Sequence, residues 1–235
     1  MVILTERLDT IAKNINKGER VADIGTDHGY LPLYLIENNL SDQVIFTDVS
    51  KGSLSKAEEN AKRLFPDKSF DFRIGNGLDP IELGEVDTIV MAGIGGILVT
   101  EILDWNIKKS LSFGKYILQP RNNSGILRRY LTEHGFVIES NLVVPEDRRF
   151  SEIIVTVPPE NYTGITVTDN IPDVMFDFPD SLSNKITGYE KDYLKACLSQ
   201  EETILQKIIA GSGEANIESR QARIDRINAL LDCLE

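Results

Sequence analysis

Features that define several protein classes are scarce in this sequence of 235 residues. Its two cysteines, Cys197 and Cys233, lie outside any Cys-x-x-Cys spacing, so neither a disulfide framework nor a zinc site is indicated. The longest uncharged apolar stretch, 89–99, has eleven residues, three of them glycine, whereas a membrane-spanning helix needs roughly 20. The N-terminal segment reaches a charge at Glu6 without an apolar run, so no secretory signal is expected. We therefore expect a cytoplasmic protein with reduced thiols, no metal and no membrane partner.

Positive charge is also in deficit, because 25 Lys and Arg face 37 Asp and Glu, which gives a net charge of −12. Phosphate contacts need clustered Lys and Arg, so the total argues against a nucleic-acid partner. The deficit is uneven, however. Residues 159–235 have 7 basic and 14 acidic residues, whereas residues 105–151 have eight basic and four acidic. A basic surface is therefore expected from residues 105–151, supplemented by Lys13, Lys17 and Arg20.

The composition, with 41% hydrophobic and 26% charged residues, is that of a globular protein with a sizeable core. Over residues 1–158, strand-like apolar runs alternate with segments of helical periodicity. We expect helices over 4–15, 30–39, 52–65, 96–106 and 124–134, and strands over 20–25, 43–49, 70–74, 86–92, 115–118, 136–144 and 153–157. This alternation predicts an α/β fold with a doubly wound, mostly parallel sheet. The last two strands, on either side of Pro145-Glu146-Asp147, are expected to form an antiparallel closing pair.

The pattern changes after residue 158, and we expect three parts: a cofactor-binding domain over 1–158, an acidic linker over 159–183 and a helical hairpin over 184–235. The linker contains Pro172 and Pro179, so it is expected to be irregular, with its apolar residues docked on the first domain. Gly211-Ser212-Gly213 is expected to separate the two hairpin helices. Apolar residues at 217, 224, 227, 231 and 234 follow steps typical of a coiled-coil seam. Two seams remain open for the first helix, one through Tyr193 and one through Leu194.

The first predicted strand ends in Asp23-Ile24-Gly25-Thr26-Asp27-His28-Gly29, directly before a helix. A glycine at such a turn lets a cofactor approach the backbone, and the free amides at the helix start favour a carboxylate or another anion. The second strand ends in Asp48, whose carboxylate suits the hydroxyls of an adenosine ribose. The two loops together predict an adenosine-containing cofactor. A turn glycine before an unrelated helix is the alternative interpretation.

The glycine spacing distinguishes between adenosine cofactors. NAD and FAD sites use G-x-G-x-x-G, but here Asp27 occupies the second glycine position. A carboxylate would repel a pyrophosphate, whereas it tolerates S-adenosylmethionine, which has no phosphate and carries a sulfonium cation. In two later loops, Asn76 is placed to bind an adenine edge, and the glycines around Gly93 leave room for a ring or a reacting group. Both loops are equally typical of tight turns.

These motifs resemble those of the class I S-adenosylmethionine-dependent methyltransferases, and within them the bacterial TrmK-type enzymes that methylate N1 of adenine 22 in tRNA. The resemblance covers most of the chain. It rests on the hairpin pattern and on four segments, 23–32, 92–96, 118–121 and 150–153. It implies a Rossmann-like methyltransferase fold, S-adenosyl-L-methionine as cofactor and tRNA as partner.

The resemblance also implies catalytic importance for Asp27 and His28, and cofactor contacts at Asp23, Gly25, Asp48, Asn76, Gly77 and Gly93. The full set expected at the cofactor is Asp23, Gly25, Thr26, Gly29, Asp48, Val49, Asn76, Gly77, Leu78, Ala92 and Gly93. The set expected at the substrate is Tyr30, Gln119, Pro120, Arg121, Asn122, Arg148, Arg149 and Phe150.

Adenine N1 already has a lone pair, so its methylation needs no prior deprotonation. Catalysis then consists of in-line positioning and stabilisation of the positive charge that develops on the base. Asp27 is our candidate, as acceptor of a hydrogen bond from the exocyclic amine; the alternative is that it binds only the cofactor's ammonium group. Three roles stay open for His28: contact with the base, capping of the helix, or a purely structural role. Because N1 lies on the Watson–Crick edge, the base must leave its pair and stack in the pocket.

Phosphate contacts are expected at Arg148 and Arg149, while Arg128-Arg129 fits either RNA binding or a solvated helix face. Arg220, Arg223 and Arg226 share a face of the last helix and are expected to contact RNA, with a structural role as the alternative.

Two other functions stay open. One is a methyltransferase that acts on a small molecule or a protein, which the acidic total charge favours. The other is a non-catalytic assembly module in which the hairpin mediates self-association. A monomer is favoured, although the sequence leaves the oligomeric state open.

Overall fold

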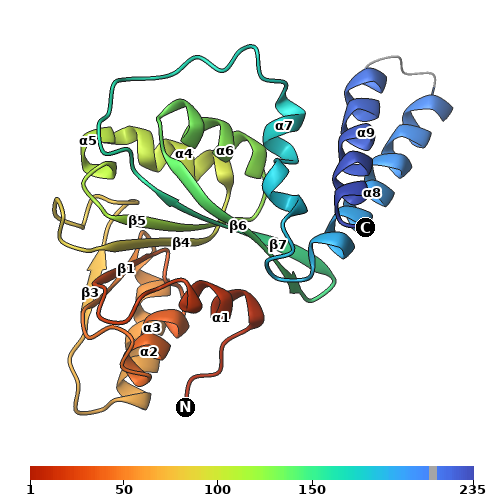
Figure 1. Cartoon of the computed structure of the whole chain (residues 1–235). Coiled ribbons are helices and arrows are strands. Elements are labelled where there is room, and N and C mark those ends of the chain that lie inside the picture. Colours follow the sequence, from red (N-terminus) through yellow and green to blue (C-terminus); the bar gives the residue numbers. More distant parts are fainter. Residues whose placement is uncertain (212–215) are drawn as a thin grey trace.

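The structure is a computed structural model that describes residues 1–211 and 216–235, and it contains one seven-stranded sheet (Figure 1). The strand order is β3-β2-β1-β4-β5-β7-β6. All neighbouring pairs from β3 to β5 are parallel, whereas β7 is antiparallel to both β5 and β6. The predicted doubly wound sheet with an antiparallel closing strand is therefore confirmed. The strands are β1 Val21–Ile24, β2 Val44–Asp48, β3 Asp71–Ile74, β4 Thr88–Ile94, β5 Lys115–Pro120, β6 Val137–Glu146 and β7 Arg149–Val157.

Helices cover both faces of the sheet (Figure 1). One face carries α1 Glu6–Lys13, α2 Tyr30–Glu37 and α3 Lys51–Leu64. The other carries α4 Gly96–Trp105, the short α5 Ile107–Ser110 and α6 Ser124–Glu133. Ser50 caps α3, because its side chain accepts a hydrogen bond from the Ser53 amide in the first turn of the helix.

The central strands are apolar at successive positions because both of their faces are buried. In β4, Val90 faces the α1–α3 layer while Met91 faces the α4–α6 layer, and Ile117 and Leu118 of β5 divide in the same way. Alternate side chains of a strand point to opposite faces. One continuous apolar run thus supplies two cores, which fixes the sheet between its helical layers.

The chain direction places the ligand crevice. From β1 the chain moves outward to β2 and β3 and then returns to β4, which pairs with the other side of β1. Ligands of open α/β sheets bind beyond the carboxyl ends of the strands at such a switch point. The loops after Ile24 and Ile94 therefore border the expected crevice.

The strands β6 and β7 continue past the rest of the sheet as a two-stranded arm. The residues of β7 that pair with β5 are 154–156, whereas its pairing with β6 continues to Arg149. The reversal is tighter than expected: Pro145 and Glu146 remain in β6, and Asp147 turns the chain with a φ of 52°. Residues of the arm pack against α1 on one side and against the C-terminal helices on the other.

The linker contains more regular structure than expected. A short helix, α7 Asp173–Asp177, follows Pro172, and a 3-10 helix, η1 Asp180–Ser183, follows Pro179. The prediction of an irregular segment is wrong here because proline is tolerated where a helix begins, although it breaks a helix interior. Docking of the linker is confirmed for Phe176 and Phe178, which are buried.

The C-terminal helices, α8 Glu190–Ala210 and α9 Ile217–Cys233, pack against each other as the predicted hairpin. Ile224, Ile227 and Leu234 of the α9 seam are buried, and Leu194 is the buried apolar residue of α8. Gly211 caps α8, while Ser212 and Gly213 of the expected break lie outside the described residues.

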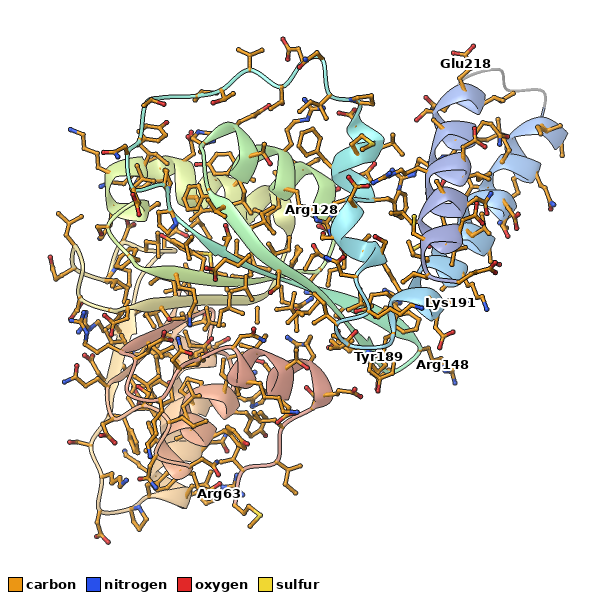
Figure 2. All side chains as sticks on the ribbon, viewed as in Figure 1. Arg63, Arg128, Arg148, Tyr189, Lys191 and Glu218 are labelled. Atoms are coloured by element: carbon orange, nitrogen blue, oxygen red, sulfur yellow. The ribbon has the colours of Figure 1, made fainter. Side chains whose placement is uncertain are left out.

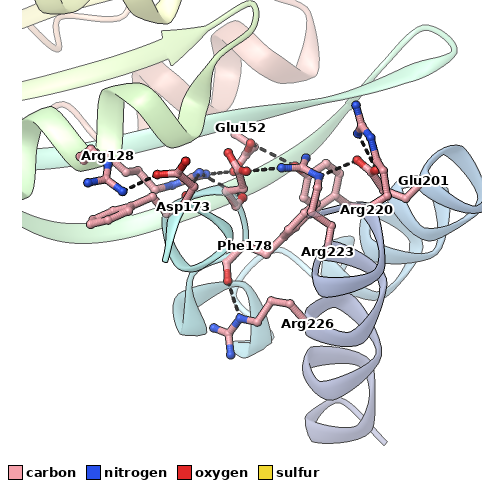
Figure 3. Close-up of polar contacts among 12 residues, drawn as sticks. Arg128, Glu152, Asp173, Phe178, Glu201, Arg220, Arg223 and Arg226 are labelled. Atoms are coloured by element: carbon pink, nitrogen blue, oxygen red, sulfur yellow. Dashed lines mark hydrogen bonds and ion pairs between the residues drawn. The ribbon is translucent and has the colours of Figure 1, made fainter. Parts of the chain in front are cut away.

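The prediction that Arg220, Arg223 and Arg226 of α9 contact RNA is corrected, because these side chains bind other residues of the protein (Figure 3). Arg220 and Arg223 both bind Glu201 of α8. Arg223 also pairs with Asp177 and lies over the Phe178 ring, and Arg226 donates to the Phe178 carbonyl. Arg223 and Arg226 therefore fasten the hairpin to the acidic linker, whereas Arg220 joins the two helices of the hairpin.

Arg128 is buried and Arg129 is partly exposed, and both pair with acidic residues of the protein itself, so neither RNA contact nor a solvated helix face describes them. Arg128 is 2% exposed and pairs with Glu152 of β7. Arg129 pairs with Asp173 of the linker and lies over the Phe176 ring. Both side chains neutralise acids that come from distant parts of the sequence.

Candidate active site

A cavity of about 1260 Å³ lies at the carboxyl ends of β1, β4 and β5, where the switch point predicts a ligand site. Its volume exceeds the roughly 300–1,000 Å³ of typical small-molecule pockets, so it has room for a cofactor and part of a second substrate. Most of the predicted site residues line it: Asp23, Gly25, Thr26, Asp27, His28, Tyr30, Ala92, Gly93, Gln119, Pro120, Arg121, Arg148, Arg149 and Phe150.

Asp23 is the buried acid of this cavity. Its side chain accepts a hydrogen bond from the Thr26 hydroxyl at 2.7 Å, and the residue is 6% exposed. Burial raises the pKa of Asp23 to about 6, although the Thr26 hydrogen bond and the charge of Arg7 oppose the rise. A buried carboxylate of this kind gains most from a cationic partner, and the ammonium of an amino-acid moiety is such a partner.

Asp27 projects from the loop between β1 and α2. Its φ of 45° is left-handed, and its amide donates to the Asp48 carboxylate at 3.2 Å. The Asp27 carboxylate is about half exposed and faces Lys56 Nζ at 3.4 Å and His28 Nε2 at 3.5 Å. The loop therefore holds this acid at the cavity by its backbone, with the side chain accessible.

His28 and Tyr30 form an aromatic ledge beside Asp27. Their rings stack with centroids 5.5 Å apart and planes inclined by 12°. Tyr30 is 41% exposed and lines the cavity. A flat ligand can stack on such a surface.

Two of the predicted glycines leave open space at the cavity. A Cβ at Gly93 would meet no atom within 4 Å, and a Cβ at Gly25 would meet only the Ile94 side chain, at 3.5 Å. Both residues have a φ near 76°, which glycine adopts without strain. Glycine at 29, 77 and 96 serves protein packing instead, because a Cβ there would approach other atoms to 3.0 Å or less.

Five predicted residues lie at the same sheet edge but outside the cavity wall. Asp48 is buried and accepts hydrogen bonds from the amides of Asp27 and Ser50. Val49 beside it is 70% exposed. The other three, Asn76, Gly77 and Leu78, line a separate hollow beside Trp105.

Gln119 is held in one orientation by the predicted Gly93 and by Arg7, which the sequence did not single out. Its Oε1 accepts hydrogen bonds from the Gly93 amide at 2.9 Å and from Arg7 Nη1 at 3.0 Å. Arg7 Nε also donates to Glu146 at 2.6 Å, which in turn accepts from the Ser151 hydroxyl. Arg7 and Glu146 thus line the cavity, and no motif predicts this because α1 and the arm meet only in the folded chain.

Arg121, Arg148 and Arg149 are exposed at the mouth of the cavity. Figure 2 shows Arg148 at the tip of the β6–β7 arm. Asn122, which was expected at the substrate, accepts a hydrogen bond from the Gly96 amide through its backbone carbonyl. Of the basic stretch 105–151, these three arginines are the ones that border the cavity.

Within residues 1–211 and 216–235, no group of three or more His, Cys, Asp or Glu side chains is placed to hold a metal ion. None of the helices described in these ranges has the length and apolar character needed to cross a membrane.

The open glycines and the buried acid suit a cofactor that combines a flat ring with a cationic amino-acid end. Residues 4–154 match the family described as "Methyltransferase domain". The fold, the cavity and this match define a class I S-adenosylmethionine-dependent methyltransferase.

One curated sequence and two solved structures identify the family within this class. A tRNA (adenine(22)-N(1))-methyltransferase of Bacillus subtilis is 30% identical over 168 residues, which are 70% of this chain and 71% of that protein. The crystal structure of the B. subtilis m1A22 tRNA methyltransferase TrmK superposes with a TM-score of 0.75 at 25% identity, over 100% of this chain and 98% of that one. The structure of M. capricolum TrmK in complex with S-adenosyl-homocysteine superposes with a TM-score of 0.78 at 26% identity, over 99% of each chain. This chain belongs to the TrmK-type methyltransferase family.

Proposed function

We propose that this protein transfers a methyl group from S-adenosyl-L-methionine to N1 of adenine 22 in tRNA. The observation that carries the proposal is the cavity at the switch point, where glycine-opened loops and a buried acid meet an aromatic ledge and a rim of arginines. The relatives named for this reaction cover nearly the whole chain, including the hairpin. Because tRNA is the substrate, we place the protein in the cytoplasm.

The bound cofactor would supply a methyl group on a positively charged sulfur. Asp23 would bind its ammonium group, and Asp48 would accept hydrogen bonds from its ribose hydroxyls. The absence of side chains at Gly25 and Gly93 would let the cofactor lie close to the backbone. Tyr30 and Phe150 would enclose the adenine of the substrate on its faces. This arrangement orients the base edge toward the cofactor and excludes water from the reacting atoms.

Asp27 would act on the charge that develops on the adenine. As N1 gains the methyl group, the exocyclic amine becomes a stronger hydrogen-bond donor. A carboxylate that accepts from it is then worth more in the transition state than in the ground state, which is the condition for catalysis. If Asp27 instead binds only the cofactor's ammonium group, its loss should weaken cofactor binding as much as turnover.

The proposal is tested by labelled-methyl transfer to a tRNA transcript with A22 and to the same transcript with G22. Labelling of the first alone, with the modified base mapped to position 22, is the expected result. Equal labelling of both transcripts would reject the position, and labelling of neither would favour a small-molecule or protein acceptor.

We also propose that Arg121, Arg148 and Arg149 contact the phosphates around the flipped nucleotide. These are exposed and border the cavity, whereas the arginines of α6 and α9 pair with acidic residues of the protein itself. The protein as a whole is acidic, so RNA binding would be confined to this rim. Strong retention of unrelated RNA at physiological salt would contradict a confined surface.

Reversing two rim charges, with Arg148→Glu and Arg149→Glu together, should weaken tRNA binding and flatten its dependence on salt. Each lost phosphate contact lowers the slope of log K against log salt by about one, so a decrease of about two is expected. The matched control is Lys62→Glu with Arg63→Glu on α3, which changes net charge equally and lies far from the arm (Figure 2). Titrations at several salt concentrations measure both. An equal decrease in the control would move the RNA surface away from the rim.

The division into a domain over 1–158, a linker and a hairpin, and the monomeric state, stay predictions. Sedimentation at several protein concentrations measures the latter directly.

A further inference from the structure

The wall of the cavity at Phe150 is supported from behind by the C-terminal hairpin. Phe150 is the second residue of β7 and lines the cavity. Its ring packs edge-on against the ring of Tyr193 in α8, with centroids 6.0 Å apart and planes inclined by 69°. Phe150 and Tyr193 both pack against the hydrophobic cluster of the hairpin and linker. The orientation of this wall therefore depends on a residue some forty positions away in the chain.

Tyr193 holds β7 at two points. Besides its ring contact with Phe150, its hydroxyl donates a hydrogen bond to Glu152 Oε1 at 3.0 Å. Phe150 and Glu152 are two residues apart on one strand, so their side chains share a face. Burial raises the pKa of Tyr193, so its hydroxyl stays protonated and remains a donor.

Glu152 is itself fixed, which makes it a rigid anchor. The buried Arg128 pairs with it, and Asn141 Nδ2 donates to Glu152 Oε2 at 3.2 Å. Arg128 also donates to the Phe176 carbonyl at 2.8 Å, which joins the linker to the same group (Figure 3). A shift of Tyr193 would leave a buried carboxylate short of one donor, an unfavourable state.

We propose that Tyr193 is a positioning residue for the methyl transfer: it fixes the Phe150 ring in the plane against which the flipped adenine packs. The inference rests on the proposed function, since it needs a nucleobase in the cavity. It gives the hairpin a part in the geometry of the site, in addition to any contact with RNA. A base held at the wrong angle is misaligned with the methyl group, and small misplacements of reacting groups cost large factors in rate.

A double-mutant cycle between Phe150→Leu and Tyr193→Leu tests the proposal. Each single variant should lower kcat on tRNA about tenfold, with little change in KM for tRNA or in S-adenosyl-homocysteine affinity. If Tyr193 acts through Phe150, the double variant should be no slower than the Phe150→Leu variant. Multiplication of the two losses, to about a hundredfold, would overturn the proposal.

Two further variants separate positioning from loss of structure. Tyr193→Phe keeps the ring and removes only the hydroxyl, so about a threefold loss of kcat is expected, again absent in the Phe150→Leu background. Arg226→Ala loosens the hairpin from the linker without touching β7. It should raise KM for tRNA and leave kcat unchanged. A fall of kcat in Arg226→Ala equal to that in Tyr193→Leu would overturn the positioning role of Tyr193, because docking of the hairpin alone would then account for the loss.

The same experiments distinguish a failure of the proposed function from a failure of the positioning role of Tyr193. If the wild-type protein does not methylate the A22 transcript, the proposed function fails and the cycle has no basis. If it does, and the two losses multiply, the function stands and the positioning role is wrong.

Discussion

Asp27→Asn should lower kcat on tRNA by roughly 100-fold, the loss typical of removing one transition-state hydrogen-bonding group. Asparagine tolerates the left-handed backbone at this position, so the loop keeps its shape. Its amide replaces one carboxylate oxygen by a donor and removes the negative charge that stabilises the methylated base. Affinity for S-adenosyl-homocysteine should change by less than about threefold if the acid acts on the base. Single-turnover kinetics and calorimetry measure the two quantities.

The matched control for Asp27 is Lys56→Met. Lys56 Nζ lies 3.4 Å from the Asp27 carboxylate, so this variant removes the neighbouring charge and leaves the acid in place. Turnover should stay near that of the wild type. Equal losses of turnover and cofactor affinity in Asp27→Asn would reassign Asp27 to the cofactor's ammonium group.

Asp23→Asn should weaken S-adenosyl-homocysteine binding by about 10- to 100-fold, because a hydrogen bond between charged groups is lost. The same variant should make the ligand-free protein more stable. Burial raises the pKa of Asp23 from 3.8 to about 6, so above pH 6 the folded protein keeps a charge that the unfolded chain would solvate better. Removing it should raise the free energy of unfolding by about 1–3 kcal/mol at pH 7.5. Calorimetry of binding and of thermal unfolding measures both effects.

The pH dependence follows with a definite sign. Between the unfolded and folded pKa values of Asp23, the native state binds more protons than the unfolded state, so this group's contribution to stability rises as the pH falls from about 6 toward 3.8. Cofactor affinity should move in the opposite direction and weaken below about pH 6, since the ammonium group needs the ionised acid.

The control for Asp23 is Thr26→Val, which removes the 2.7 Å hydrogen bond but keeps the charge. That bond opposes the rise in the pKa of Asp23, so its loss should move the midpoint of the pH profile upward and lower the stability at pH 7.5. An Asp23→Asn variant that is less stable than the wild type would contradict the account of a penalised buried charge.

The arginines illustrate where prediction from the sequence stopped. Eight basic residues within 105–151 and three in α9 indicated an RNA surface. In the folded chain, Arg128 faces Glu152 and Arg223 faces Asp177, so charges remote in sequence cancel in pairs. Residues 105–151 do have an excess of basic residues, but only basic side chains that are not paired with acids in the folded chain can form an RNA-binding surface. Pairing over such separations depends on the docking of the linker, which charge patterning does not encode.

Two residues of the cavity were missed for a similar reason. Arg7 stands in an amphipathic helix whose apolar face alone is visible in the sequence, and Glu146 stands in what resembled a turn. Arg7 binds both Glu146 and Gln119 because α1 packs against the β6–β7 arm. Only this tertiary packing places Arg7 beside Gln119, which also accepts from the Gly93 amide.

The sequence by itself determined the doubly wound sheet, the switch-point crevice and the acidic glycine loop at Asp23–Gly29. These follow from local rules, because apolar periodicity sets the elements and strand ends gather the loops at one edge. The tertiary structure alone decided which arginines remain at the rim, which glycines open onto the cavity and how Tyr193 supports Phe150. Those outcomes depend on contacts between segments far apart in the chain, where burial and charge pairing select among side chains of the same kind.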